Sequence, residues 1–302
     1  MSQIVSASPH IRGKVTTQTI MRDVLIALVP ALIASLLIFG VKALLVTAVS
    51  VAACVFFEWA FEKLTGKKST ICDLSAAVTG VLLAFNMPAS IPLWQVVFGA
   101  LVAIVVVKQL FGGIGKNFAN PAITARIVML LAFANTMTDW TGGAELVSSA
   151  TPLAMMASGE QPAFMTLLLG THGGSIGETC AIALLLGFAY LLYRKVITWH
   201  TPVAVIATTF VLTFILGENP VNHVLSGGLL LGAIFMATDY STTPATPLGR
   251  VIFGIGVALL TVLIRLYGSY AEGMSFAILF MNILTPYISR MTATKPFGGV
   301  KA

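Results

Sequence analysis

The chain has 302 residues, of which 57% are hydrophobic and only 9% are charged, against roughly 45–50% and ~25% in a soluble domain. So few charges cannot cover a water-soluble surface. The composition therefore excludes a cytosolic globular enzyme, a secreted disulfide scaffold, a disordered chain and a nucleic-acid-binding protein, and it leaves a helical protein that crosses a membrane several times. The excess of 17 basic over 11 acidic residues is explained first by the side of the membrane on which basic residues lie.

Ten apolar segments follow one another along the chain, each close to the ~20 residues that a transmembrane helix needs. The run 24–61 is too long for one span and for a signal peptide, so we expect two spans with a turn at residues 40–42. The fold class that follows is an all-α polytopic membrane protein forming one domain, residues 1–302. The other spans are predicted near 71–87, 93–111, 120–136, 176–193, 200–217, 223–238, 248–267 and 273–290.

The basic residues give these spans an orientation. With a cytoplasmic N-terminus, all but three of the 17 fall on the inner side, the exceptions being Lys42, Arg265 and Arg126. Such an asymmetry predicts that both termini are cytoplasmic. The long connection 137–175 is then extracytoplasmic, and it carries acidic residues but no Lys or Arg. A connection of this length is usually functional or disordered.

Similar short motifs recur in the two halves of the chain. The third predicted span matches the eighth, and five is an odd number, so the halves 1–136 and 176–302 are expected to be inverted repeats. Inverted repeats place ligand sites at their interface, often beside broken helices. We expect outer breaks near 86–88 and 267–275 and inner breaks near 112–121 and 238–247, with one ligand near each face. Residues 74–77, 88–90, 92–93, 98–99, 102–103 and 110–112 match 225–228, 244–246, 247–248, 253–254, 257–258 and 266–268, at offsets of 151 to 156.

The segment 112–121 is a glycine-rich turn whose backbone N–H groups could bind an anion or the polar edge of a ring. It lacks the spacing of a nucleotide-binding loop. The alternative is an ordinary tight turn that caps the next helix and opens it with Pro121, and spacing alone favours this alternative. The candidate residues are Gly112, Gly113, Lys116, Asn117 and Asn120.

Two further residues have an ordinary and a functional interpretation. Arg126 lies roughly 9 Å into a predicted span, where a charge costs ~2.5–3.5 kcal/mol, so it either faces protein, a cofactor or water or extends to the inner interface. Thr151 precedes Pro152, which predicts an N-cap that starts a short helix over 153–157. Glu58 and Asp73 are expected at the inner interface, with a role in an ion path as the alternative.

The cysteines and histidines do not predict a metal site within one chain. Cys54, Cys72 and Cys180 have no paired spacing, and the four histidines are scattered. A cysteine of this kind usually packs as a small apolar residue, although one of the three could contribute to a site shared with another subunit. The residues also assemble no nucleophile, base and acid, so no catalytic set is predicted.

Taken together, the motifs in 112–121, 173–178, 237–250 and 272–282 resemble the family that contains the D-type membrane subunits of the ion-translocating Rnf oxidoreductase complexes and, more distantly, the B-type membrane subunits of the sodium-translocating NADH:quinone reductases. The resemblance covers nearly the whole chain. It implies a membrane subunit of a bacterial or archaeal cell (inner) membrane that relays electrons through flavins. The electrons would link NADH and ferredoxin chemistry in partner subunits to the movement of Na⁺ or H⁺.

The resemblance also implies a covalent cofactor on Thr151. In this family an extracytoplasmic threonine, in a pattern close to Asp-x-x-Ser/Thr-Gly-Ala-Thr, carries FMN through a phosphoester bond that a flavin transferase installs. Here residues 145–151 read Glu-Leu-Val-Ser-Ser-Ala-Thr. Ser148 therefore keeps the pattern, whereas Ser149 replaces its glycine and Glu145 replaces its aspartate.

A second, non-covalent flavin, riboflavin, is implied nearer the cytoplasmic side. From the repeat we expect it at the inner breaks, between Gly112–Pro121 and Thr243–Arg250. The FMN is expected against the outer breaks, at Asn86, Glu178 and Glu272.

The implied partners are the other membrane, flavin and iron–sulfur subunits of the complex, the flavin transferase and membrane lipid. The chain itself would bind no NADH, because it has no nucleotide-binding domain, and it holds no complete active site of its own. One alternative is a solute transporter or channel, since inverted five-span repeats are a transporter architecture. Another is a purely structural membrane anchor for other subunits.

Overall fold

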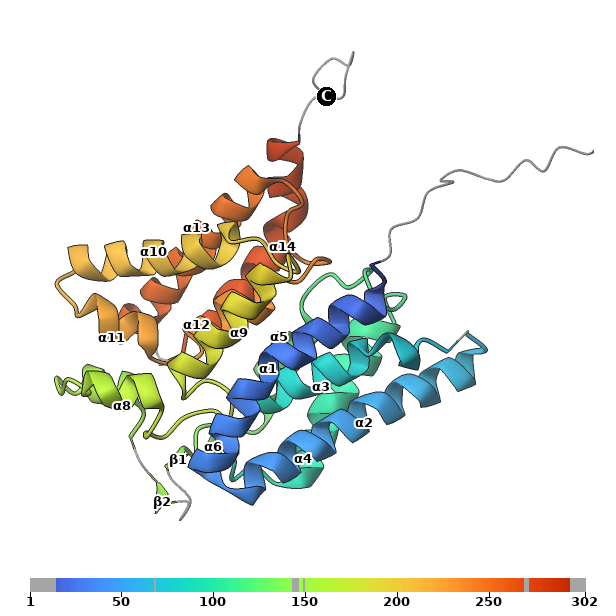
Figure 1. The fold of residues 1–302 in the computed structure, drawn as a ribbon, viewed down its shortest axis with the longest axis horizontal. Helices are drawn as coiled ribbons and strands as arrows, with labels where there is room; N and C mark the ends of the chain where they lie inside the picture. Colours follow the sequence, from blue (N-terminus) through green and yellow to red (C-terminus); the bar gives the residue numbers. More distant parts are fainter. Residues whose placement is uncertain (1–14, 68, 143–146, 149, 269–271, 294–302) are drawn as a thin grey trace, which may run out of the picture.

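The computed structural model describes residues 15–67, 69–142, 147–148, 150–268 and 272–293 and is almost entirely helical (Figure 1). Two strands of two residues each, β1 (Thr141–Gly142) and β2 (Val147–Ser148), pair antiparallel. The helices are α1 (Thr17–Phe39), α2 (Val41–Thr65), η1 (Ile71–Asp73), α3 (Ser75–Phe85), α4 (Leu93–Leu101), η2 (Val102–Gln109), α5 (Pro121–Ala132), α6 (Ala134–Met137), α7 (Pro152–Ala157), α8 (Phe164–Leu169), α9 (Ala181–Tyr193), α10 (His200–Ile215), α11 (Pro220–Leu225), α12 (Leu229–Leu231), η3 (Gly232–Met236), α13 (Pro247–Tyr267) and α14 (Met274–Thr292).

Within the described residues, α1, α2 and α13 are long and apolar enough to span a bilayer, judged by length and composition. The chain is therefore a membrane protein with several apolar helices. The predicted turn after the first span is confirmed at Gly40, which has φ 69° and separates α1 from α2. Glycine occupies this region of backbone conformation without the steric cost that a Cβ atom brings.

Several helices are shorter than the predicted spans because the chain breaks inside the bundle. The 11 residues of α3 and the 12 of α5 extend about 16 and 18 Å at 1.5 Å per residue, roughly half of a hydrocarbon core of about 30 Å. Residue Leu74, with φ 65°, separates η1 from α3. The eighth predicted span is divided in the same way, because α11 ends before Ser226 and α12 begins only after Gly228.

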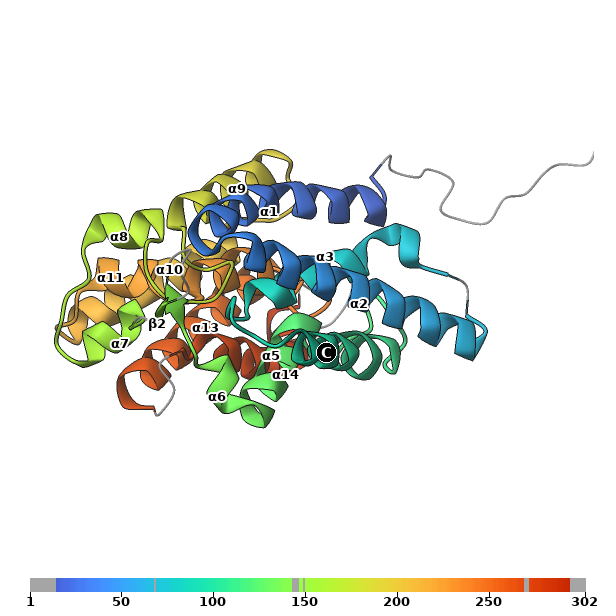
Figure 2. The ribbon, with the colours of Figure 1, turned by 90° about the horizontal axis from the view of Figure 1, so that it is seen from below.

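The two halves of the chain pack against each other through equivalent helices. Within the first half α2 packs on α3 and α4, and within the second half α10 packs on α11 and α13. Between the halves, α1 packs on α9 and α5 packs on α14 (Figures 1 and 2). The two contacts between the halves join helices at matching positions of the predicted repeats.

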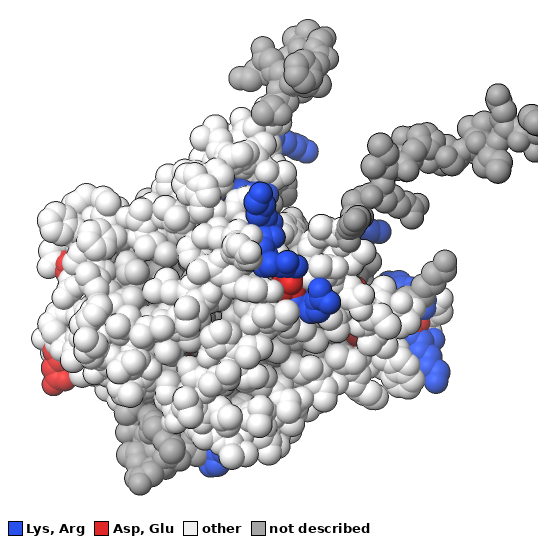
Figure 3. All heavy atoms as spheres, viewed as in Figure 1, with Lys and Arg blue, Asp and Glu red and all other residues white. Residues whose placement is uncertain are grey.

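The surface carries few charges. On the face drawn in Figure 3 most atoms belong to uncharged residues, and the Lys and Arg side chains gather mainly toward one end of the molecule. Large apolar side chains such as Leu37, Trp94 and Phe214 are exposed. Exposed apolar side chains are expected where lipid rather than water surrounds a protein.

Candidate cofactor sites

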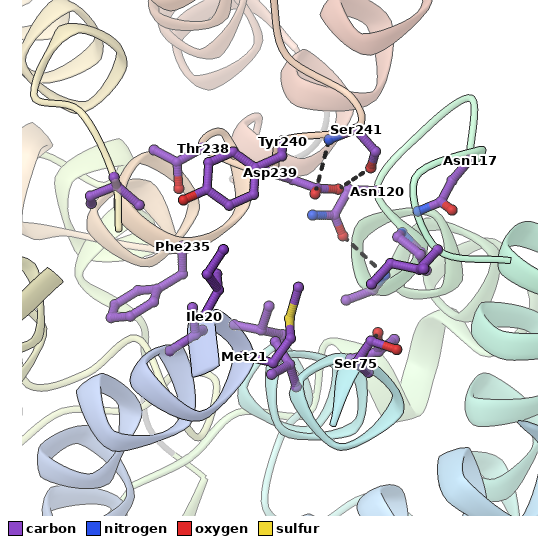
Figure 4. A pocket seen from close by; sticks show the side chains of 18 of the residues that line it. Ile20, Met21, Ser75, Asn117, Asn120, Phe235, Thr238, Asp239, Tyr240 and Ser241 are labelled. Atoms are coloured by element: carbon purple, nitrogen blue, oxygen red, sulfur yellow. Dashed lines mark hydrogen bonds between the residues drawn. The ribbon is translucent and has the colours of Figure 1, made fainter. Parts of the chain in front are cut away.

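One pocket lies between the two halves, and the space among its lining residues, open solvent included, is about 790 Å³ (Figure 4). Ligand pockets in proteins are mostly apolar, with a few polar groups. We call it the inner pocket, because the glycine-rich turn predicted on the inner side contributes to its wall. Its lining residues are Ile20, Met21, Val24, Ser75, Val78, Thr79, Leu82, Lys108, Ile114, Asn117, Asn120, Pro121, Ala122, Leu191, Val196, Ile197, Ile234, Phe235, Thr238, Asp239, Tyr240 and Ser241.

Asn120 serves both as a helix cap and as part of the wall of the inner pocket. Its Oδ1 accepts hydrogen bonds from the backbone N–H groups of Ala122 (3.1 Å) and Ile123 (3.3 Å), which confirms the predicted N-cap of α5. Its Nδ2 donates to the carbonyl of Met236 at 3.4 Å. The structural interpretation of the turn is thus correct, and the cap residue also faces the pocket.

Asp239 supplies a carboxyl group to the same pocket, in the connection between η3 and α13. It accepts hydrogen bonds from the backbone N–H and the hydroxyl of Ser241 at 3.3 and 3.0 Å and from the hydroxyl of Thr242 at 3.3 Å. Burial raises the pKa of Asp239 above its ordinary value, and the hydrogen bonds from Ser241 and Thr242 oppose that change.

Other residues predicted for the inner site lie elsewhere. Thr243 and Arg250 line an adjoining hollow of about 280 Å³, which shares Val196, Ile197, Thr238 and Tyr240 with the inner pocket. Arg250 donates to Thr198 Oγ1 at 2.8 Å and to the carbonyl of Pro244 at 3.1 Å. The structure therefore places Thr238–Ser241, rather than Thr243–Arg250, opposite the glycine-rich turn.

Within that turn, the glycines shape the backbone and do not line the inner pocket. Gly112 and Gly113 have φ values of 113° and 92°, a conformation in which side chains are strained. Lys116 is exposed, and it too is absent from the lining. Asn117 does line the pocket, and its buried Oδ1 has no hydrogen-bond partner in the described part of the chain.

The sequence reasoning missed Lys108 and Ser75 as pocket residues. Lys108 was assigned to the inner side as an orienting charge, but it is only 2% exposed. Its Nζ lies 2.6 Å from Glu58 Oε1 and donates to Ser75 Oγ at 2.6 Å. Glu58 is fully buried among protein groups. The sequence does show Lys108 and Glu58 as charged residues within apolar runs. It contains nothing that indicates an ion pair between them.

The second pocket, which we call the outer pocket, contains Thr151. It encloses about 570 Å³, also partly open to the surroundings. The predicted N-cap is confirmed, because Thr151 Oγ1 accepts a hydrogen bond from the N–H of Ala154 at 3.2 Å and Pro152 opens α7. The lining residues are Arg126, Ile127, Leu130, Met137, Thr138, Trp140, Thr151, Glu272, Ser275 and Phe276.

Arg126 is held by protein groups at the wall of the outer pocket. Its guanidinium forms an ion pair with Glu272 and donates to Ser275 Oγ at 2.8 Å and to Asn86 Oδ1 at 3.2 Å. The residue is only 5% exposed. The structure therefore decides between the two interpretations: Arg126 faces protein and the pocket, and does not extend to the interface.

A chain of hydrogen bonds links the walls of the two pockets. Asn86, which caps the end of α3, accepts from Arg126 on the outer side and donates to Met236 Sδ at 3.6 Å. Met236 in turn accepts through its carbonyl from Asn120 on the inner side. Asn86 was expected against the outer flavin. It is absent from the lining of the outer pocket, and through Met236 it connects Arg126 to the wall of the inner pocket.

Glu178 lies behind the outer pocket, in the segment that connects α8 to α9. Its Oε1 accepts from the N–H of Ser175 at 3.1 Å, and its Oε2 has no partner among the described residues. A Cβ atom at Gly228 would lie 3.3 Å from this Oε2 and 3.7 Å from Arg126 Nη1. The missing side chain of Gly228 therefore leaves space between the carboxylate and the guanidinium.

Unpaired polar atoms gather around Glu178. Of the eleven buried side-chain polar atoms without a partner in the described residues, seven belong to His172, Ser175, Glu178, His223, Ser226 and Arg265. Buried polar groups are nearly always hydrogen-bonded, to ordered water where no protein group is available. We therefore expect bound water in this region.

Two predicted residues near Thr151 cannot be placed in the site. Ser148 lies in β2, and its side chain is outside the described part, as is the whole of Ser149. No group of three or more His, Cys, Asp or Glu residues within the described ranges could hold a metal ion. Cys54 is buried, Cys72 is exposed, and neither forms a disulfide.

The structure is that of a membrane protein whose helical bundle contains two pockets, with walls joined by hydrogen bonds through Asn86 and Met236. The model of the NQR2, RnfD, RnfE family matches residues 4–298, and the chain belongs to this family.

Relatives that align with nearly the whole chain carry related names. The chain is 45% identical to the D subunit of the Na⁺-translocating ferredoxin:NAD⁺ oxidoreductase complex of Acetobacterium woodii, over 98% of this chain and 96% of the relative. It is 39% identical to the D subunit of the proton-translocating ferredoxin:NAD⁺ oxidoreductase complex of Clostridium ljungdahlii, over 97% and 96%. It is 34% identical to the D subunit of the ion-translocating oxidoreductase complex of Halorhodospira halophila, over 99% and 96%.

Proposed function

We propose that this chain is the flavin-carrying membrane subunit of an Rnf-type complex and relays electrons through two flavins. The electrons pass between partner subunits that react with NADH and ferredoxin, and their flow is coupled to translocation of Na⁺ or H⁺. The names of the relatives support the complex. The observation that carries the relay is the presence of two pockets whose walls are joined by hydrogen bonds from Arg126 through Asn86 and Met236 to Asn120.

The residues of the outer pocket are suited to FMN attached to Thr151. Thr151 is half-buried at the start of α7, so its hydroxyl faces the pocket wall and remains within reach of a flavin transferase. Trp140 and Phe276 offer aromatic surface to a ring, and Arg126 offers a cation to a polar edge or a phosphate. Guanidinium groups are well suited to binding phosphate and other oxyanions.

The inner pocket is suited to an uncharged flavin such as riboflavin. Its wall is mostly apolar, and its polar groups gather at the edges, with Asn117, Asn120 and Asp239 in Figure 4. The unpaired Oδ1 of Asn117 is a free acceptor for a ring N–H. The pocket contains no cluster of cations of the kind that a phosphate group would require, since Lys108 is the basic residue in its lining.

Bound flavins would supply the electron carriers, and the chain would position them. Arg126 places a positive charge at the outer site, and its contacts with Glu272, Asn86 and Ser275 keep that charge in place. The hydrogen bonds of Asn86, Met236 and Asn120 join the wall of one site to the wall of the other.

The remaining parts of the proposal concern the membrane. We infer ten spans in two inverted repeats, both termini on the cytoplasmic side of a bacterial or archaeal cell membrane, and the connection 137–175 on the opposite side. The partners are the other membrane, flavin and iron–sulfur subunits of the complex, and a flavin transferase matures Thr151. The contacts of α1 with α9 and of α5 with α14 support the repeat.

The covalent flavin is tested at Thr151. Thr151→Asn retains an N-cap for α7 but removes the hydroxyl, so the denatured chain should lose all covalent flavin fluorescence under ultraviolet light while its melting temperature stays close to that of the wild type. Thr138→Ala, which removes another hydroxyl from the same pocket, should remain fluorescent. A fluorescent Thr151→Asn band, or a wild-type band without FMN by mass spectrometry, would disprove the assignment.

The non-covalent flavin is tested at Asn117. Its side-chain oxygen accepts no hydrogen bond from the described part of the chain, so Asn117→Ala should leave the fold intact. Loss of one hydrogen bond of about 0.5–1.5 kcal/mol should weaken riboflavin binding about 2- to 12-fold, as measured by equilibrium dialysis on the purified chain. The exposed Lys116→Ala is the control, and equal affinities for Asn117→Ala and the wild type would contradict the placement.

A solute transporter is the second candidate, because the short helices α3 and α5 border the inner pocket and α5 also borders the outer pocket. Half-helices of this kind bind substrates in transporters. Uptake of a solute into vesicles that contain only this chain, free of flavin, would favour it over the electron relay.

A further inference from the structure

Lys108 and Glu58 form an ion pair in the interior of the helical bundle, next to the inner pocket. The exposed fractions of the two side chains are 3% and 0%, and Nζ lies 2.6 Å from Oε1. Taking two charges out of water costs several kcal/mol per ion, and a buried pair is often less stable than an apolar replacement. Fold stability alone therefore explains this pair poorly, which points to a role at the pocket.

The local backbone directs Lys108 toward the pocket. The helix changes from α4 to a π-helix, η2, over Val102–Gln109, and Lys108 lies in its last turn. A π-helical turn rotates the following side chains relative to an α-helix, and such turns occur frequently at functional sites. Lys108 consequently lies in the lining of the inner pocket beside Ser75, whose hydroxyl accepts from its Nζ.

A hydrogen-bond network holds the ammonium group in place. Glu58 Oε1 accepts from Lys108, from Gln109 Nε2 at 2.8 Å and from Thr70 Oγ1 at 3.3 Å. Ser75, the other acceptor of Lys108, donates to Asp73 at 2.5 Å. Two hydrogens of the ammonium group are therefore bound by Glu58 and Ser75, and an ammonium group has a third hydrogen to donate.

The charges that line the inner pocket are one cation and one acid. Lys108 and Ser75 form one edge, and Asp239 lies at the opposite edge, as the positions of Ser75 and Asp239 in Figure 4 show. The carboxylates of Glu58 and Glu62 lie behind Lys108 and do not line the pocket. A ligand in the pocket would therefore meet a positive charge on one side only.

We propose that Lys108, positioned by Glu58 and Ser75, is the residue that stabilises the reduced, negatively charged form of the flavin in the inner pocket. This inference rests on the proposed function. When a redox partner in the complex supplies two electrons and water supplies one proton, the oxidised ring becomes an anion. The two electrons leave again toward the outer flavin, and the proton returns to water.

The physical reason is the low polarity of the site. Two opposite charges attract several times more strongly in a protein interior than in water, so one fixed cation at the pocket wall changes the free energy of an anionic ligand far more than that of a neutral one. The oxidised ring is neutral. Lys108 should therefore affect binding of the reduced form and leave binding of the oxidised form nearly unchanged.

The test compares riboflavin in its two oxidation states. The purified full-length chain, freed of non-covalent flavin, is titrated with oxidised riboflavin and with dithionite-reduced riboflavin at alkaline pH, where the reduced ring is an anion. Lys108→Met alone would leave Glu58 unpaired and could fail to fold, so the main variant is the double change Glu58→Gln with Lys108→Met. Lys108→Arg retains the cation, and the exposed Lys116→Met is the matched control.

We expect the double variant to bind oxidised riboflavin within about 3-fold of the wild type and reduced riboflavin at least 10-fold more weakly. Lys108→Arg should lose less affinity for reduced riboflavin than the double variant does, and Lys116→Met should bind both forms as the wild type does. At a pH low enough to keep the reduced ring neutral, the difference should vanish, which a merely structural role of Lys108 would not produce.

Two results would contradict the inference, and they are distinguishable. If the double variant weakens both forms equally, or neither, Lys108 has no role in stabilising the reduced ring, while the proposed inner flavin stands. If the wild-type chain binds neither form of riboflavin, the proposed inner site and this inference both fail.

Discussion

Replacing Arg126 with leucine should lower the free energy of unfolding by about 3 kcal/mol, the lower end of the cost of breaking a buried ion pair. The lower end applies because the side chain of Glu272 is 15% exposed and retains some contact with solvent. The change leaves Glu272 without its cation and removes the donors to Asn86 and Ser275. Thermal unfolding in detergent or nanodiscs would measure the loss as a lower melting temperature.

Two controls separate charge from packing in this prediction. The double variant Arg126→Leu with Glu272→Leu should regain part of the stability, because it leaves no unpaired charge. Arg290→Leu, at an exposed position near the end of α14, should change the melting temperature little. If Arg126→Leu is as stable as Arg290→Leu, the contacts of Arg126 with Glu272, Asn86 and Ser275 do not stabilise the fold.

Replacing Gly177 with alanine should destabilise the fold by about 1–3 kcal/mol or more, the usual range for overpacking. A Cβ atom at this position would lie 2.3–2.4 Å from the side chain of Phe85, at the end of α3. The N–H of Gly177 also donates to the carbonyl of Phe85 at 3.0 Å, and that of Ile176 donates to Met87 at 3.0 Å. The segment would have to move away from α3 and would take Glu178 with it.

Gly99→Ala is the matched control for Gly177→Ala. The added methyl group would meet the flexible ends of Met87 and Met129, which can move, and alanine also favours the helical conformation of α4. We expect near-wild-type stability for Gly99→Ala and a clearly lower melting temperature for Gly177→Ala. Equal melting temperatures would show that the segment 173–178 does not need its close contact with α3.

Features that depend on neighbouring residues could be predicted from the sequence. The turn at Gly40 and the N-caps Asn120 and Thr151 all follow from local backbone preferences. A cap residue bonds to N–H groups two or three positions further along the chain, so its partners are already named by the sequence. Helix lengths were less predictable, because the breaks at Leu74 and Gly227 depend on tertiary contacts.

Features that depend on contacts between residues far apart in the sequence could not be predicted from it. The sequence contains Lys108 and Glu58 as separate charges in apolar runs, and nothing in their spacing pairs residues 50 positions apart. The same holds for Arg126 and Glu272, which are 146 positions apart. The sequence also named Thr243 and Arg250 for the inner site, and these residues line an adjoining hollow that shares part of its wall with the inner pocket.

The low charge content of this sequence by itself determined the class of protein, because a water-soluble surface cannot be made from 9% charged residues. The same few charges gave the predicted orientation. Only the tertiary structure decided which of them meet inside the bundle, because the free energy of a buried charge depends on the partner that folding brings to it. Lys108 and Arg126, each paired with a carboxylate at the wall of a pocket, are the outcome of that folding.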